Sequence, residues 1–318
     1  MTAAANDPAG RDATRPADPI SWPDGARSAA ILSYDMDAEA VVLAIDLSHG
    51  ERLSVMSHQA YGPVTGVPRI LAMLERQDVK ATFFCPGYTA ERYPELLRRV
   101  ADAGHEIAHH GYLHEAVRGM SAAAEATMLD RGLEALERVT GRRPVGYRAP
   151  MWETTYATPG LLLDRGFAYD SSLMDCDVPY ELAEHPGDGA RSLVEIPVHW
   201  ALDDWEQYAY LPEAFGSGLI EDPAKVLSMW TAELAAYHDH GACFTLTNHP
   251  FLSGRLGRLR AMETLIETMH ALPGLWIATA EQVATHVRGL RLAPRAFPQP
   301  VVDTRPGELS DRSPGAPA

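Results

Sequence analysis

The chain has 318 residues, 46% of them apolar and 8% aromatic, a composition typical of one large or two small α/β domains rather than of a disordered protein. Its formal net charge of −16 repels phosphate groups, so we expect neither nucleic acid nor a membrane as a partner. Three scattered cysteines indicate no disulfide framework, and without an apolar leader or an apolar run of about 18 residues we expect a cytoplasmic protein.

Residues 1–18 and the proline-rich 292–318 lack hydrophobic periodicity, and we expect both to be flexible tails around one domain at 19–291. Between them, short apolar runs alternate with amphipathic stretches. Strands are expected at 28–34, 79–84, 106–108, 146–148, 167–169, 194–198, 243–246 and 276–278. Helices are expected at 67–77, 93–103, 121–139, 159–165, 223–240 and 258–271. This alternation predicts a parallel α/β barrel with its chemistry at the carboxyl ends of the strands.

An acidic pair follows the first expected strand. Asp35 and Asp37 are two residues apart, so in an extended chain their carboxylates point the same way. Two carboxylates in one pocket need a nearby cation, and one of them can bind a metal while the other acts as a base. A solvated loop is the alternative.

Four histidines lie in the ten residues 105–114. His110 and His114 are four apart, which would place two imidazoles on one face of a helical turn, at the right distance to chelate one metal. His105 and His109 share that spacing, so spacing alone leaves the register open. Two imidazoles and one carboxylate suit Zn²⁺, with Co²⁺, Ni²⁺ or Mn²⁺ as alternatives, and leave a position for water.

Later strand ends carry further candidates. Arg148 can orient a carboxylate, and His249 can protonate a leaving nitrogen. Substrate contacts are expected from a second group of residues. These are Tyr147, Trp152, Asp204, Trp205 and Arg255.

These pieces, in this order, resemble the polysaccharide deacetylase family, the NodB homology domain of carbohydrate esterase family 4, from about residue 22 to residue 287. The resemblance implies a distorted (β/α)7 barrel in a single domain. It implies that Asp37, His110 and His114 bind the metal, which selects the register of the histidine pair. It further implies that Asp35 is the base, Arg148 its tether and His249 the general acid.

Two departures from the common pattern accompany this resemblance. Met36 separates the two aspartates, and the later acidic motif is matched by Asp170, Asp177 or Asp204 without a decision between them. The spaced pair and the Asp170-Ser171-Ser172-Leu173 run are similar to a branch of peptidoglycan-deacetylase-like proteins and cyclic imide hydrolases. That branch is related to a metal-free allantoinase, and the intact ligand set here favours a metal-dependent enzyme.

The expected function is therefore hydrolysis of a non-peptide carbon–nitrogen bond. A small intracellular cyclic imide or ureide is slightly favoured as substrate, with an N-acetylated sugar of peptidoglycan or chitooligosaccharide type as the alternative. A non-catalytic carbohydrate-binding barrel is the alternative of another class. The segment 41–61 is expected to cover the pocket or to form a subunit contact, and the resemblance suggests a homo-oligomer, specifically a tetramer.

Overall fold

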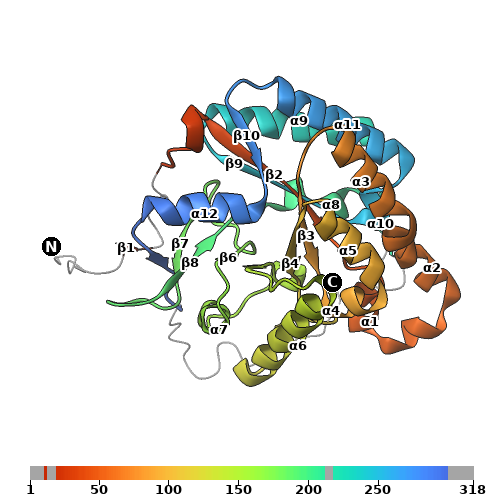
Figure 1. Cartoon of the computed structure of the whole chain (residues 1–318), viewed down its shortest axis with the longest axis horizontal. Coiled ribbons are helices and arrows are strands. Elements are labelled where there is room, and N and C mark those ends of the chain that lie inside the picture. The colour runs from red at the N-terminus through yellow and green to blue at the C-terminus, as the bar shows by residue number, and fades with distance from the viewer. Residues whose placement is uncertain (1–10, 13–18, 212–217, 300–318) are drawn as a thin grey trace, which may run out of the picture.

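The computed structural model describes residues 11–12, 19–211 and 218–299. Figure 1 shows helices arranged around the outside of a set of central strands. Within the described residues, no helix is both long and apolar enough to span a bilayer.

Seven parallel strands form a distorted ring. Strand β2 (Ser28–Asp35) pairs with β3 (Thr82–Cys85), and the sheet continues through β4 (Glu106–His109), β5 (Gly146–Tyr147), β6 (Tyr169–Asp170) and β8 (Ser192–Glu195). On its other side β2 pairs with β9 (Cys243–Asn248). A single parallel bridge from Asp203 to Thr247 joins the chain beyond β8 to β9. The predicted distorted barrel is thereby confirmed.

The first strand shows why the ring is stable. All eight residues of β2 are buried, and alternate side chains enter different clusters. Leu32 and Tyr34 pack in the layer under the outer helices, while Ala29 and Ile31 pack in the other cluster. This division follows from the two-residue period of a strand. A strand covered on both faces is typical of parallel sheets.

Helices cover the outside, close to their predicted positions. Figure 1 shows them around the strands. They include α3 (Val67–Arg76), α5 (Pro94–Asp102), α6 (Ala122–Thr140), α7 (Thr158–Asp164), α9 (Pro223–Asp239) and α11 (Leu256–Ala271). Ser121 caps α6, since its side chain accepts a hydrogen bond from the backbone of Ala124 at 3.2 Å. The sequence analysis did not predict α4 (Gly87–Arg92) or α12 (Ala280–Leu290), which are also helical.

The expected tails differ from the structure where it describes them. Strand β11 (Arg295–Ala296) lies within the second expected tail and pairs with both β1 (Arg11–Asp12) and β7 (Tyr180–Ala183). Arg295 is buried, and its guanidinium lies 2.9 Å from the carboxylate of Asp175. The folded part of the chain therefore extends past residue 291, because strand pairing and the ion pair of a buried arginine hold a segment that has no periodicity. The rest of both tails lies outside the described residues.

The segment between β2 and α3 folds as short helices. It comprises α1 (Ala40–Ile45), a 3-10 turn at Leu47–Glu51, α2 (Leu53–Tyr61) and a π-helical turn at Gly62–Gly66. A methyl group on Gly66 would lie 2.2 Å from the carbonyl oxygen of Pro250, so only glycine permits this contact. The π turn thus packs directly on α10 (Pro250–Ser253), which follows His249.

Candidate metal centre and active site

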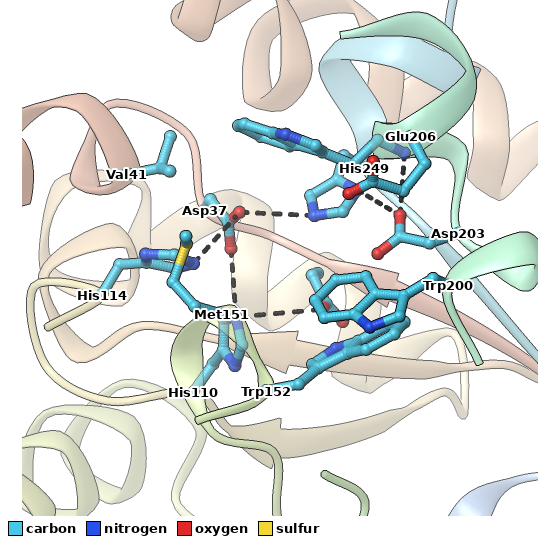
Figure 2. Close-up of a pocket in the computed structure, with 12 residues that line it drawn as sticks. Asp37, Val41, His110, His114, Met151, Trp152, Trp200, Asp203, Glu206 and His249 are labelled. Atoms are coloured by element: carbon cyan, nitrogen blue, oxygen red, sulfur yellow. Dashed lines mark hydrogen bonds and ion pairs between the residues drawn. The ribbon is translucent and has the colours of Figure 1, made fainter. Parts of the chain in front are cut away.

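Three predicted metal ligands meet at the carboxyl ends of β2 and β4. The Nε2 atom of His110 lies 3.4 Å from one carboxylate oxygen of Asp37, and the Nε2 atom of His114 lies 3.5 Å from the other. One potential ligand atom from each of the three residues lies within 4.8 Å of the others. All three side chains are buried, and Figure 2 shows them together at the pocket.

The two histidines meet through a loop and not along a helix. Residues 110–114 follow β4 without helical structure, so the predicted helical turn is wrong. Gly111 has φ +74° and His114 has φ +60°, and this reversal of the chain brings the two imidazole rings to 5.0 Å between centroids. A non-glycine residue at positive φ stores backbone strain, which is common at functional sites.

The donor set fits a divalent cation. The Nδ1 atom of His110 donates to the backbone carbonyl of Arg148 at 2.8 Å, which leaves the Nε2 lone pair facing Asp37. Burial lowers the pKa of His110 to about 3, so this imidazole is neutral. Among the described residues, neither buried carboxylate oxygen of Asp37 has a hydrogen-bond partner. A buried carboxylate and a lone pair that face each other without a proton require a cation between them.

Asp35 lies beside this centre and is held by Arg148. The Nη1 atom of Arg148 donates to Oδ1 of Asp35 at 2.8 Å, and both side chains are buried. The other oxygen of Asp35, Oδ2, lies 3.8 Å from Nε2 of His110. One oxygen is thus tethered while the other faces the metal ligands.

His249 approaches Asp37 from the opposite side, after β9. Its Nε2 atom lies 3.6 Å from Asp37, and its Nδ1 atom lies 2.7 Å from Oδ1 of Asp204. Burial by itself lowers the pKa of His249, but the neighbouring carboxylates of Asp203 and Asp204 outweigh it and raise the pKa to about 10. Burial raises the pKa of Asp203 to about 8, although His249 opposes that shift.

A cavity of about 100 Å³ opens over these groups. Figure 2 shows Asp37 between His110, His114 and His249. Trp152 and Trp200 stack on one another at 4.3 Å between ring centroids. The remaining lining residues are Asp35, Val41, Met151, Asp203, Trp205 and Glu206.

Of the residues expected to contact substrate, Trp152 and Trp205 line this cavity. Asp204 is fully buried behind His249, where it also accepts hydrogen bonds from the backbone of His249 and from the hydroxyl of Ser253. Tyr147 is buried against His109 and Phe167. Asp204 therefore contacts His249 and does not line the cavity.

Arg255 is the other expected contact that does not line the cavity. Its guanidinium stacks on the ring of Tyr61, the last residue of α2, at 3.5 Å. Val41, the first residue of the 41–61 segment, does line the cavity.

The structure also separates the three candidates for the later acidic motif. Asp204 contacts His249, whereas Asp170 accepts hydrogen bonds from the backbone of Ser171 at 2.7 Å and the hydroxyl of Ser172. Asp177 accepts from the hydroxyl of Tyr237. Asp204 is therefore the candidate that meets the histidine.

Three lining residues were not predicted from the sequence, namely Met151, Trp200 and Glu206. The available signals were the tryptophan five residues before Trp205 and the glutamate directly after it. Met151 and Trp152 both have positive φ, +58° and +53°. Methionine and tryptophan give no sequence signal for this backbone conformation.

Comparison with known proteins now decides the family. The family model for polysaccharide deacetylase matches residues 55–167. The chain is 31% identical to a peptidoglycan deacetylase of Helicobacter pylori over 279 residues, which cover 80% of this chain and 94% of the relative. The chain belongs to the polysaccharide deacetylase family. It is a hydrolase of the deacetylase family that acts on carbon–nitrogen bonds.

Solved structures agree with this assignment. A structure of a putative polysaccharide deacetylase from Mycobacterium smegmatis is 54% identical, with a TM-score of 0.88, and the match covers 91% of this chain and 99% of that one. An allantoinase structure matches with a TM-score of 0.76 at 23% identity, over 90% of this chain and 99% of that one. At that identity the second match shows the shared fold alone.

Proposed function

We propose that the protein is a metal-dependent N-deacetylase that acts on an N-acetylated sugar of the peptidoglycan type. The observation that carries the metal-dependent hydrolysis is the buried Asp37, whose two oxygens face three imidazoles and, among the described residues, accept no hydrogen bond. The same pocket holds a tethered carboxylate on one side and a protonated imidazole on the other.

Asp37, His110 and His114 are the residues that would hold the cation. A divalent cation supplies Lewis acidity, which polarises an amide carbonyl and makes a water molecule easier to deprotonate. One carboxylate and two imidazoles are a ligand set that Zn²⁺ favours, and they leave room for water and substrate. The buried and neutral His110 is preorganised for this role, because its Nδ1 atom is already committed to the Arg148 carbonyl.

Asp35 is the proposed general base. Arg148 occupies its Oδ1 atom, so Oδ2 is the oxygen that faces the cavity and can take a proton from water. The guanidinium also sets the orientation of Asp35, because it binds one carboxylate oxygen at hydrogen-bond distance.

His249 is the proposed general acid. Its Nδ1 proton is held by Asp204, so the Nε2 proton is the one directed toward the cavity. The surrounding carboxylates keep the ring protonated at neutral pH. It can therefore donate that proton to the nitrogen that leaves when the carbon–nitrogen bond breaks.

The comparisons support the sugar substrate better than the cyclic imide that the sequence analysis placed first. The Helicobacter pylori relative, with 94% of its length covered, is a peptidoglycan deacetylase. A Gibberella zeae relative, 30% identical with 70% of its length covered, is described as peptidoglycan deacetylase-like. The stacked tryptophans beside the cavity suit the apolar face of a sugar ring.

A cyclic imide remains the second candidate because of the pocket's size. A cavity of about 100 Å³ accommodates an acetamido group or a small ring, but not several sugar units within it. The polymer would have to lie across the mouth, whereas a small ring would enter completely.

The test is an assay of the purified protein loaded with Zn²⁺ on two sets of compounds. One set contains peptidoglycan fragments and chitooligosaccharides, with acetate release as the measurement. The other contains succinimide, phthalimide, dihydrouracil and allantoin, with loss of the ring as the measurement. We expect acetate release, and we expect it to disappear when the metal is removed and to return when Zn²⁺ is restored.

The Asp35→Asn variant serves as the matched control because it removes the proposed base and leaves the three ligands in place. It should bind one Zn²⁺ per chain and release no acetate. Turnover of the cyclic compounds alone would overturn the proposed substrate. Full activity without metal would overturn the whole mechanism.

A further inference from the structure

The run Asp170-Ser171-Ser172-Leu173 is not part of the cavity, and the mechanism above gives it no role. We propose that this run and Glu195 form a bracket that aims the guanidinium of Arg148 at Asp35, with Ser171 as the key positioning residue. The inference rests on the proposed function, because it concerns the same base. We refer to Asp170, Ser171, Ser172 and Glu195 as the bracket.

The pair of Arg148 and Asp35 cannot fix its own geometry. Only Nη1 of the guanidinium donates to Asp35, at 2.8 Å, so this is not the two-point contact in which arginine and carboxylate align each other. The same nitrogen also donates to the hydroxyl of Ser33 at 2.9 Å. The direction of the guanidinium therefore depends on what holds its other nitrogens.

Ser171 holds both of these nitrogens. Nε of Arg148 donates to the backbone carbonyl of Ser171, and Nη2 donates to its hydroxyl, each at 3.1 Å. The ring of Phe84 lies 4.0 Å from the guanidinium carbon and limits its movement on one face. Arg148 and Ser171 are both fully buried, so water does not compete for these contacts.

The two carboxyl groups of the bracket hold Ser171 in place. One oxygen of Asp170 accepts from the backbone of Ser171 at 2.7 Å and from the hydroxyl of Ser172. One oxygen of Glu195 accepts from the backbone of Ser172 at 3.0 Å and of Leu173 at 2.8 Å. Each backbone N–H group of the turn is thus engaged by a buried side chain.

The bracket also binds the backbone of Ala149, the residue that follows Arg148. The backbone N–H of Ala149 donates to the hydroxyl of Ser172 at 2.8 Å, so backbone and side chain of this segment are held from the same turn. Asp170 and Glu195 are paired across β6 and β8. Three neighbouring strand ends therefore act together on the position of one guanidinium.

The experiment is a double-mutant cycle in the Zn²⁺-loaded protein with the substrate that the assay above identifies. Ser171→Ala removes one hydrogen bond to the guanidinium, and we expect kcat to fall about three- to tenfold with KM and metal content unchanged. In the Arg148→Lys background there is no Nη2 atom to hold, so the same change should lower kcat less than about twofold. A purely structural role would give equal fold-changes in both backgrounds.

Ser28→Ala is the matched control. Its hydroxyl is also buried and hydrogen-bonded, 2.7 Å from Nδ1 of His238, and it lies at the opposite end of the strand that carries Asp35. We expect a loss of thermal stability similar to that of Ser171→Ala but an unchanged kcat. A loss of kcat in both serine variants, or in neither, would overturn the proposal.

A second readout does not need turnover. In ¹⁵N NMR spectra of the Zn²⁺-loaded protein, the Nη2 protons of Arg148 should exchange with solvent about tenfold faster in Ser171→Ala than in the wild type or in Ser28→Ala, because a hydrogen bond of about 1.4 kcal/mol no longer protects them. If the wild type hydrolyses nothing and this exchange still responds, the proposed function fails and the bracket stands. Unchanged exchange overturns the bracket.

Discussion

His110 and His249 are the same residue type, are both buried, and both face Asp37, yet their environments give them opposite protonation states. Burial lowers the pKa of His110 to about 3, and the backbone carbonyl of Arg148 takes its single proton. His249 is backed by Asp203 and Asp204, and its pKa rises to about 10. Burial alone therefore does not decide the protonation state of a buried histidine. The group that contacts its Nδ1 atom decides it.

This comparison distinguishes a metal ligand from a general acid within one pocket. A backbone carbonyl accepts a hydrogen bond from the imidazole but adds no charge. The imidazole therefore stays neutral and offers a lone pair. A carboxylate adds a negative charge, so the imidazole stays protonated and offers a proton. Substitutions can break this distinction, and the largest effects are expected at the histidines themselves.

Replacing His110 with alanine should abolish both metal binding and turnover. The variant loses one of three ligands, so we expect less than one tenth of the wild-type Zn²⁺ content and a loss of activity of at least about 10³-fold. Elemental analysis and acetate release measure the two quantities. His105→Ala is the control, because His105 bonds to the backbone of Ala81 and not to Asp37; equal metal loss there would contradict the assignment.

Replacing His249 with alanine should remove activity and leave the metal in place. Loss of a general acid costs about 10²- to 10⁴-fold in kcat, while Asp37, His110 and His114 remain intact. The same two measurements apply. If His249→Ala loses its Zn²⁺ as completely as His110→Ala, then the two histidines do not differ in role and the comparison is wrong.

Replacing Asp204 with asparagine should weaken the acid without removing it. Asparagine keeps an oxygen toward Nδ1 of His249 but loses the charge that supports protonation, and we expect kcat to fall about 10- to 100-fold. Metal content should not change. Activity equal to the wild type would mean that Asp203 alone is enough to set the state of His249.

The smallest effect concerns the buried carboxyl group of Asp170. Burial raises the pKa of Asp170 to about 7, against hydrogen bonds from Ser172 and Ser171 that lower it. Between about pH 4 and pH 7 the folded protein therefore holds this proton more tightly than the unfolded chain does. The free energy of unfolding should fall as pH rises through this range, by up to about 1.4 kcal/mol per pH unit.

Urea unfolding of the wild type and of Asp170→Asn at several pH values measures this slope. Asparagine cannot ionise, so the variant should show a flatter dependence on pH than the wild type. A slope that is identical in both proteins would show that Asp170 does not contribute to it.

The sequence predicted the barrel well because strand and helix periodicities are local properties. The eight-residue β2 and the capped α6 lie within one or two residues of their predicted bounds. Strand β7 was not predicted, because Tyr180–Ala183 is antiparallel and short, and its place depends on pairing with β8 and β11. Such pairings carry no local signal.

The site was predicted unevenly for a similar reason. The resemblance, and not spacing, selected His110 and His114, and the helical turn was wrong because Gly111 and His114 reverse the chain with positive φ. Sequence could not decide between Asp170, Asp177 and Asp204, because the contact that separates them, between Asp204 and His249, joins residues 45 positions apart in the chain. Arg255 was expected at the substrate and instead covers Tyr61. The cytoplasmic location, the tetramer and the choice of Zn²⁺ stay predictions.

The strands of the ring are paired over unequal lengths, and this should affect how the pocket opens. Most strand contacts around β2 are ladders of three to six residue pairs, whereas Asp203 and Thr247 make a single bridge among the described residues. Asp204 and His249 sit on either side of this seam, whereas the three proposed metal ligands follow β2 and β4, which both pair with β3 through ladders of three or four residue pairs. Local opening of the structure should therefore begin at the seam. Such opening would widen the entrance for a bulky polymer while the metal centre keeps its shape.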